Sequence, residues 1–322
     1  MSTTLIPEAA AGLPTEAWRA PERSHAQHVD RAPGGILIAT DGSPGADAAV
    51  RAGITLACRH ALDAELLTVY EPSSAAVEEA ITAVNVEELE ARLQAEQRER
   101  VEAQRERAGA DRVVWPLRFE VGPPAHTIAR VARARGDDLI VVGLGGHGPL
   151  ERMLGRETAL QVIRHAGVPV LAVAPEASAA LPRHAVAAVD FSDSSLRASQ
   201  TALRLLGGVG TLTLIHVAPR LAGPPSETEA LARFHLDDAA DMLRLFRCRL
   251  AARSDAGDAV RVRTVTRTGD PATAILAFAR AAGADLIVTG SHGRSFVQRA
   301  LLGSVSTRLL RSAGCSVLVG PR

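Results

Sequence analysis

Two short glycine-containing segments near the C-terminus have the residue types and spacing of an anion-binding site. The first is Gly290-Ser291-His292-Gly293, and the second, after nine further residues, is Gly303-Ser304. Glycine has no Cβ, so backbone N–H groups beside it can approach an anion closely. A hydroxyl and free N–H groups at the start of the next helix add further donors. The two segments are therefore typical of a site that holds a phosphate chain between them.

An apolar run must position the first of these segments. Asp285-Leu286-Ile287-Val288-Thr289 leads directly into the glycines and predicts a buried strand. A second apolar run ends at Asp190. In doubly wound sheets, ligands bind beyond the carboxyl ends of the strands, where the strand order reverses. If the two strands are neighbours at that point, Asp190 and the glycine loop face one crevice.

The chain is internally repeated. The segment from Gly122 to Gly143 matches the segment from Gly269 to Gly290 without a gap, at an offset of 147 residues. That period is too long for a solenoid and indicates duplication of a whole domain. We expect a flexible tail at 1–32, a first domain at 33–175, a linker at 176–183 and a second domain at 184–322.

Each copy alternates strand-like and helix-like segments. Mostly continuous apolar runs indicate strands that are covered on both faces. This pattern predicts an α/β fold with a parallel sheet and helices on both faces. In the first copy the expected strands are 35–39, 65–69, 113–120, 139–142 and 168–173, and the expected helices are 44–61, 76–108, 125–135 and 152–165.

The G-x-x-G-x9-G-S pattern closely resembles the nucleotide-binding signature of the universal stress protein family. The resemblance extends over nearly everything from Gly34 to Arg322. It implies two tandem doubly wound domains, each a five-stranded parallel sheet in the order 3-2-1-4-5. It also implies a site for ATP or a related adenine nucleotide, with Mg²⁺ as a candidate companion.

The same resemblance assigns roles to particular residues. Asp190 would bond the adenine or the ribose, and the backbone of Val217 would contact the adenine. The residues expected around the ribose and phosphates of copy two are Gly290, Gly293, Arg294, Gly303, Ser304 and Ser306. The positions that remain in copy one are Asp41, Val69, Gly143 and Gly146.

Each assignment has a structural alternative. Asp190 begins an Asp-Phe-Ser-Asp-Ser-Ser run, which is also a helix-start signature. Ser304 can be an N-cap without a ligand, and Gly290 and Gly293 can serve a tight turn. His216 suits a half-buried strand position, and His292 suits a loop.

Copy one departs from the signature. Its next glycine, Gly155, comes one residue early and is followed by Arg156-Glu157. A carboxylate is then expected where phosphate oxygens would lie, although Arg156 can offset its charge and Thr158 can shift into reach. We therefore expect copy one to be a structural partner, with an altered nucleotide mode as the alternative.

Composition excludes several function classes. Positive and negative residues balance at 36 each, which argues against a generic nucleic-acid binder. All the cations are arginine, so no lysine is present for catalysis or phosphate binding. No apolar run is long enough to span a membrane, and the N-terminus lacks a secretory signal pattern. Three scattered cysteines fit a reducing compartment, so we expect a cytoplasmic protein.

These observations favour a tandem stress-response module that binds adenine nucleotide, mainly in copy two. No catalytic residue and no metal-ligand set is assigned. A slow Mg²⁺-dependent ATPase or nucleotidyl enzyme is the first alternative, and a structural partner without nucleotide is the second. The apolar strands near the end of each copy, 168–173 and 316–319, predict an intrachain pseudo-dimer. A homodimer of the whole chain stays open.

Overall fold

The computed structural model describes residues 34–71, 86–109, 115–145, 149–177, 181–220, 225–252, 260–291 and 302–321. The expected tail at 1–32 lies outside these residues. So do Gly146, His292, Gly293 and Arg294, whose predicted roles stay predictions.

One ten-stranded sheet runs through both copies, in the order β3-β2-β1-β4-β5-β10-β9-β6-β7-β8. Neighbouring strands within each copy are parallel, whereas β5 and β10 pair antiparallel at the centre. Counted within its own copy, each half therefore reads 3-2-1-4-5. Copy one contains β1 (Gly35–Ala39), β2 (Ala64–Tyr70), β3 (Leu117–Val121), β4 (Asp137–Gly143) and β5 (Val170–Val173). Copy two contains β6 (His184–Ala188), β7 (Gly210–Ala218), β8 (Val260–Thr268), β9 (Leu286–Gly290) and β10 (Ser316–Gly320).

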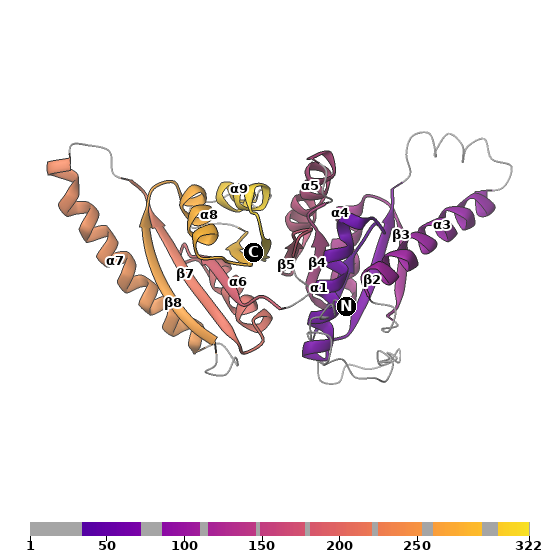
Figure 1. Ribbon diagram of the computed structural model, residues 1–322, viewed down its shortest axis with the longest axis horizontal. Helices are drawn as coiled ribbons and strands as arrows, with labels where there is room; N and C mark the ends of the chain where they lie inside the picture. Colours follow the sequence, from indigo (N-terminus) through magenta and orange to yellow (C-terminus); the bar gives the residue numbers. More distant parts are fainter. Residues whose placement is uncertain are drawn as a thin grey trace, which may run out of the picture.

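Helices cover both faces of the sheet (Figure 1). One layer contains α1 (Asp47–His60), α3 (Val86–Arg107), α6 (Asp193–Leu205) and α7 (Pro225–Ala251). The other layer contains α4 (Pro124–Arg135), α5 (Pro149–His165), α8 (Pro271–Ala281) and α9 (Ser304–Ser312). A short 3₁₀ turn, η2 (Pro44–Ala46), precedes α1.

The junction between the copies is part of the protein core. Leu318 of β10 is directly opposite Leu171 of β5, and both belong to the apolar layer beneath α1 and α6. Val317 and Val319 point to the opposite layer, beneath α5 and α9. Because strand side chains alternate between faces, both apolar layers continue from one copy into the other. The last strands thus pair within the chain, and neither is an open edge.

The expected α/β class with a mostly parallel sheet is confirmed, while several predicted boundaries are wrong. The strand expected at 113–120 is β3, which begins only at Leu117. The strand expected at 168–173 begins at Val170, directly after Pro169, which has no N–H to donate to a ladder. The helix expected at 44–61 is divided into η2 and α1, and the helix expected at 152–165 begins at Pro149.

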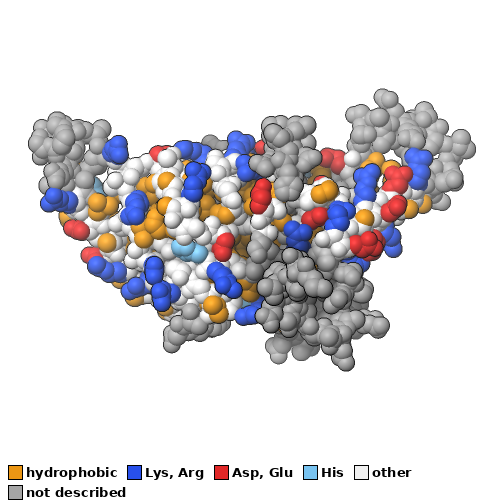
Figure 2. Space-filling view, viewed as in Figure 1, with side chains coloured by type: hydrophobic (Ala, Val, Ile, Leu, Met, Phe, Trp, Pro, Cys, Tyr) orange, Lys and Arg blue, Asp and Glu red, His pale blue; other side chains and the backbone are white. Residues whose placement is uncertain are grey.

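The surface carries both signs of charge. Figure 2 shows arginine and acidic side chains on both halves of the visible face, in keeping with the balance of 36 cations and 36 anions. Among the described helices, none is both long enough and apolar enough to cross a membrane.

Candidate functional site

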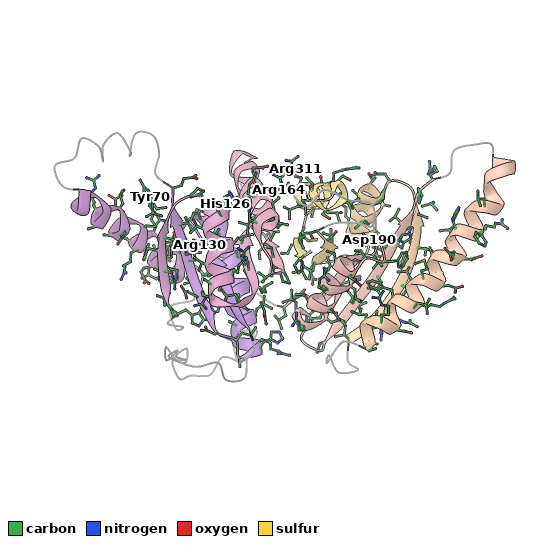
Figure 3. The ribbon with its side chains drawn as sticks, turned by 180° about the vertical axis from the view of Figure 1, so that it is seen from behind. Tyr70, His126, Arg130, Arg164, Asp190 and Arg311 are labelled. Carbon is green, nitrogen blue, oxygen red and sulfur yellow. The ribbon has the colours of Figure 1, made fainter. Side chains whose placement is uncertain are left out.

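A crevice of about 560 Å³ opens beyond the carboxyl ends of β6, β7 and β9 in copy two. This is the point where the strand order of that copy reverses, since β6 lies between β9 and β7. Its volume is within the usual range of about 300–1,000 Å³ for small-molecule sites. The predicted site residues among its lining are Asp190, Val217, Gly290, Gly303, Ser304 and Ser306. Figure 3 shows Asp190 at this end of the sheet.

Asp190 uses one carboxylate oxygen to organise the turn that follows β6. Its Oδ1 accepts hydrogen bonds from Ser192 N at 3.1 Å and from Ser192 Oγ at 2.6 Å. Ser192, rather than Asp190, is the N-cap of α6, because its Oγ accepts from Ser195 N at 3.2 Å. Among the described residues Oδ2 of Asp190 has no hydrogen-bond partner, so it can accept an N–H or O–H from a ligand.

The N-terminus of α9 also lines the crevice. Ser304 is the first helical residue, and the N-cap position belongs to Gly303, whose lack of a side chain leaves the helix start uncapped. The expected alternative, Ser304 as the N-cap, is therefore wrong. Gly303 N donates to Ser291 O at 2.9 Å, which holds the helix start against the end of β9. Uncapped N–H groups and the helix dipole favour an anion at this position.

Ser306 lines the crevice, but its hydroxyl is already used. Ser306 Oγ donates to Gly290 O at 2.7 Å and lies 3.1 Å from Thr289 Oγ1. This buried contact fastens α9 to the last two residues of β9. Ser306 thus positions the helix start, and its hydroxyl is not free for a phosphate oxygen.

Gly290 lines the crevice and also packs closely against α6. A Cβ at this position would lie 2.8 Å from Ser194 Oγ and 3.0 Å from Ser195 N. Such contacts are shorter than van der Waals distance, so any larger residue would push β9 away from α6. Gly143 has the same constraint in copy one, where a Cβ would lie 3.1 Å from Gly45 O.

Two aromatic rings, those of Phe191 and His216, lie beside Asp190, and no sequence motif marks Phe191 as a site residue. Phe191 has a φ of +64°, which costs a non-glycine residue roughly 1–2 kcal/mol. Its ring centroid lies 4.6 Å from that of His216. Copy one has Asp41-Gly42-Ser43 where copy two has Asp190-Phe191-Ser192. Phe191 thus replaces a glycine of left-handed conformation, and this difference between the copies is the sequence feature that could have pointed to Phe191.

His216 is held in one tautomer. Its Nδ1 lies 2.7 Å from Val189 O, and a carbonyl can only accept, so Nδ1 carries the proton. In the neutral imidazole Nε2 is therefore an acceptor. The expected half-buried strand position of His216 is confirmed, and the residue also lines the crevice.

Helix α7 forms one wall of the crevice, which the sequence did not reveal. The lining residues of this helix are His235, Asp238, Ala239 and Met242. They form a helical stripe, with spacings of three and four residues, that faces the ends of β6 and β7. No motif marked them because their role depends on how α7 packs.

The corresponding crevice of copy one is much smaller, at about 230 Å³. Among its lining residues are Asp41, Val69, Gly143, Gly155 and Thr158. Here α3 closes over the loop after β1. Gln97 Nε2 donates to Thr68 Oγ1 at 2.9 Å and to Asp41 O at 3.1 Å.

Helix α3 of copy one can be aligned residue by residue with α7 of copy two. Arg107 near the end of α3 binds Asp47, the first residue of α1, and Arg249 near the end of α7 binds Asp193, the first residue of α6. In this register Ala239 occupies the position of Gln97. Copy two therefore has a short apolar side chain where copy one has an amide that bonds Thr68 and Asp41.

The expected carboxylate at the copy-one phosphate position is not there. Gly155 and Thr158 line the copy-one crevice as Gly303 and Ser306 line that of copy two. The exposed Glu157 instead accepts a hydrogen bond from Arg311 Nη2 of α9 at 3.3 Å. The earlier expectation was wrong because the helix turns this side chain toward the other copy.

Arg156 also joins the two copies. Its guanidinium donates to Arg311 O and, at 3.4 Å, to Ala313 O, which are carbonyls at the end of α9. Figure 3 labels Arg311 on α9 at the junction with α5, whose Glu157 it bonds. The positive charge of Arg156 therefore stabilises the partial negative charge at the C-terminus of α9. The N-terminus of the same helix faces the copy-two crevice.

Within the described ranges, no group of three or more histidine, cysteine, aspartate or glutamate side chains is arranged to hold a metal ion.

Comparison with known proteins identifies the same duplicated unit. The model of the Universal stress protein family matches residues 35–174 and again residues 182–321. A universal stress protein of Mycolicibacterium smegmatis is 29% identical over 299 residues, which cover 88% of this chain and 96% of that protein. A universal stress protein of Mycobacterium tuberculosis is 30% identical over 230 residues, covering 68% of this chain and 73% of that protein.

Solved structures share the fold. A universal stress protein from Archaeoglobus fulgidus superposes with a TM-score of 0.61 and 21% identity, covering 89% of this chain and 98% of that one. At this identity the similarity shows the fold alone.

Proposed function

Because the chain belongs to the universal stress protein family and contains two copies of its domain, we propose that it binds ATP or a related adenine nucleotide in the copy-two crevice. In this proposal the protein acts as a stress-response module whose nucleotide biases a conformation or a partner surface. The single observation that carries the proposal is a crevice of about 560 Å³ lined both by Asp190, at its proposed base end, and by the uncapped start of α9, at its proposed phosphate end.

The chemistry of the two ends suits a nucleotide. Oδ2 of Asp190, which has no described partner, suits a donor group on the adenine or ribose. The Gly303–Ser304 helix start suits phosphate oxygens, because N–H groups and the helix dipole converge there. Val217 and Ile275 add apolar walls between the two ends. Gly293 and Arg294 are proposed to complete the phosphate end.

Copy one is proposed to be a structural partner. Its crevice of about 230 Å³ is below the usual range for small-molecule sites. On the α3 side of this crevice Gln97 bonds Thr68 and Asp41, at the position where copy two has Ala239. Arg156 and Glu157 bond Arg311 near the C-terminus of α9, so they stabilise the junction of the copies instead of lining a ligand site.

The test is isothermal titration calorimetry of ATP with the full chain and two matched variants. Asp190→Ala should lower the affinity by at least about tenfold, since a hydrogen bond to a charged group is worth roughly 1.5–3 kcal/mol. Asp41→Ala, the same change in copy one, should leave the affinity within about twofold.

Two outcomes would refute the proposal. One is the absence of ATP, ADP, AMP or cAMP binding by the wild-type chain. The other is an equal loss in both variants, which would remove the difference between the copies. Mass spectrometry of ligand released from the purified, denatured protein provides an independent check on which nucleotide is carried.

A further inference from the structure

Part of the copy-two crevice lies beneath α7 and is lined by residues to which the proposed nucleotide contacts assign no role. Two strand-end residues, Phe191 and His216, form its floor, and four residues of α7 form its wall: His235, Asp238, Ala239 and Met242. Phe191 packs against the apolar layer of α6 and α7, whereas Val217 and Ile275 belong to the layer of α8 and α9. The crevice therefore passes over the sheet from one helix layer to the other. We call this region the α7 lobe.

The α7 lobe is rich in acceptors. His216 donates from Nδ1 to Val189 O, so its Nε2 presents a lone pair, and no described residue bonds it. Asp238 is an exposed carboxylate on the facing helix. No arginine is among the described residues that line the crevice. A phosphate would be repelled here, while an ammonium or N–H group would find acceptors.

The remaining surface of the lobe is apolar. Ala239 is 5% exposed, and Met242 lies one turn further along α7. The ring of Phe191 lies against His216 at 4.6 Å and is backed by Phe246 at 6.4 Å. A methylene chain that carries a terminal amine matches this combination of apolar walls and acceptors.

Copy one provides an internal control. At the position of His216 it has Thr68, and at that of Ala239 it has Gln97, which are joined by a hydrogen bond of 2.9 Å. Gly42 replaces Phe191, and a Cβ there would lie 2.9 Å from Arg100 Cβ. The same fold is thus stable with this space filled, so the α7 lobe is not a requirement of the architecture.

We infer that the α7 lobe binds an amine-bearing chain attached to the base of the nucleotide, so that the full ligand is a base-extended adenine nucleotide. This inference rests on the proposed nucleotide site, because Asp190 at the base end of the crevice is adjacent to Phe191. The amine bonds Nε2 of His216 and the carboxylate of Asp238. The chain packs on Ala239 and Met242.

The experiment compares three probes by calorimetry on the full-length protein: ATP, N6-hexyl-ATP and N6-(6-aminohexyl)-ATP. We expect the aminohexyl probe to bind at least about tenfold more tightly than the hexyl probe, because only it supplies a donor. Ala239→Gln places the copy-one residue in the lobe. It should lower the affinity for the aminohexyl probe about tenfold and change that for ATP by less than about threefold.

Two further variants test the charge of Asp238 and provide a control outside the crevice. Asp238→Asn should reduce the preference for the aminohexyl over the hexyl probe, because it removes the negative charge while His216 still accepts a hydrogen bond. Leu245→Gln, on α7 at a side chain that is 67% exposed and outside the crevice, should change neither affinity. Thermal melting of each variant checks that the fold is retained.

The outcomes distinguish this inference from the proposed function. ATP binding with no preference for the aminohexyl probe, or equal losses for ATP and that probe in Ala239→Gln, would overturn the α7 lobe inference alone. Failure of ATP to bind the wild-type chain would refute the nucleotide site. If neither ATP nor the aminohexyl probe binds, both are overturned.

Discussion

Arg311 of α9 donates a hydrogen bond to Glu157 of α5 across the junction of the two copies, with 3.3 Å between Nη2 and Oε2. Both side chains are about half exposed, at 57% and 48%. Water and salt screen an ion pair in this setting, so the pair contributes little to stability. The central β5–β10 pairing and the apolar layers on either side of it hold the copies together.

The first prediction contrasts these two parts of the junction. Leu318→Ala should lower the free energy of unfolding by about 2–5 kcal/mol, because Leu318 is fully buried at the centre of the sheet. Glu157→Ala should lower it by less than about 1 kcal/mol. Urea unfolding of both variants provides the measurement. A larger loss for Glu157→Ala than for Leu318→Ala would contradict this account of the junction.

The second prediction concerns Gly290. Gly290→Ala should destabilise the fold by about 1–3 kcal/mol, since the new Cβ would lie 2.8 Å from Ser194 Oγ. Gly314→Ala is the matched control, because a Cβ there has nothing within 4 Å. Thermal melting compares the two. A stable Gly290→Ala protein would mean that β9 and α6 can separate without cost.

The third prediction is binding without efficient turnover. Phosphoryl transfer requires charge neutralisation at the transferred phosphate and a positioned nucleophile. Asp190 is expected to bond the adenine or ribose rather than the terminal phosphate, and His216 is oriented by a carbonyl rather than by a carboxylate. We expect steady-state ATP turnover with Mg²⁺ below about 1 s⁻¹, the low end of the usual enzyme range. Faster turnover that is abolished by Asp190→Ala would make the protein an ATPase.

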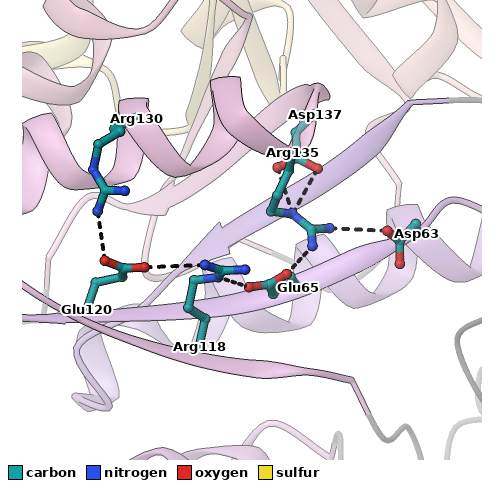
Figure 4. Close-up of polar contacts among 7 residues, drawn as sticks. All are labelled: Asp63, Glu65, Arg118, Glu120, Arg130, Arg135 and Asp137. Atoms are coloured by element: carbon teal, nitrogen blue, oxygen red, sulfur yellow. Dashed lines mark hydrogen bonds and ion pairs between the residues drawn. The ribbon is translucent and has the colours of Figure 1, made fainter. Parts of the chain in front are cut away.

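The fourth prediction follows from the polar network of copy one in Figure 4. The hydrogen bond from Arg130, with further bonds and charge from Arg118, lowers the pKa of Glu120 below its ordinary value of 4.5. The folded state therefore favours the ionised form. The resulting stability is fully present above about pH 4.5 and is lost as pH falls through the lowered pKa.

Glu120→Gln tests that dependence. The wild-type protein should exceed the variant in unfolding free energy by up to about 1 kcal/mol at neutral pH, because the ion pairs are partly exposed. The difference should shrink in denaturant titrations at acid pH. A difference that is the same at neutral pH and in acid would rule out this linkage.

The fifth prediction concerns the cysteines. Cys248 on α7 is exposed, whereas Cys58 and Cys315 are partly buried. Burial, with a smaller contribution from the charge of Asp285, raises the pKa of Cys315 to about 11. Burial also raises the pKa of Cys58. Since the thiolate is the reactive form, iodoacetamide at mildly alkaline pH should label Cys248 first.

Peptide mass spectrometry over a time course measures that order. Cys58 and Cys315 should react at the rate of Cys248 only after the protein is unfolded in guanidinium chloride. Rapid labelling of Cys315 in the native protein would show that the start of β10 opens readily.

Much of the architecture could be predicted from local patterns. The segment from Gly122 to Gly143 is repeated from Gly269 to Gly290, which predicts two copies of one domain because similar sequences fold into similar structures. Continuous apolar runs predict covered strands, and strands followed by helices predict a parallel sheet. Boundaries were less predictable, because the start of β5 depends on Pro169 and that of β3 on its pairing with β2.

The sequence by itself determined the duplicated α/β fold and the meeting of Asp190 with Gly290 at one crevice, because these follow from strand ends and glycine spacing along the chain. Only the tertiary structure decided that the copy-two crevice, at about 560 Å³, is larger than that of copy one, at about 230 Å³. On the α3 side of copy one Gln97 bonds Thr68 and Asp41, whereas Ala239 of α7 lines the copy-two crevice. The rotation of a helix likewise decided that Glu157 meets Arg311 rather than a phosphate. Such outcomes depend on packing between distant segments, which no local pattern encodes.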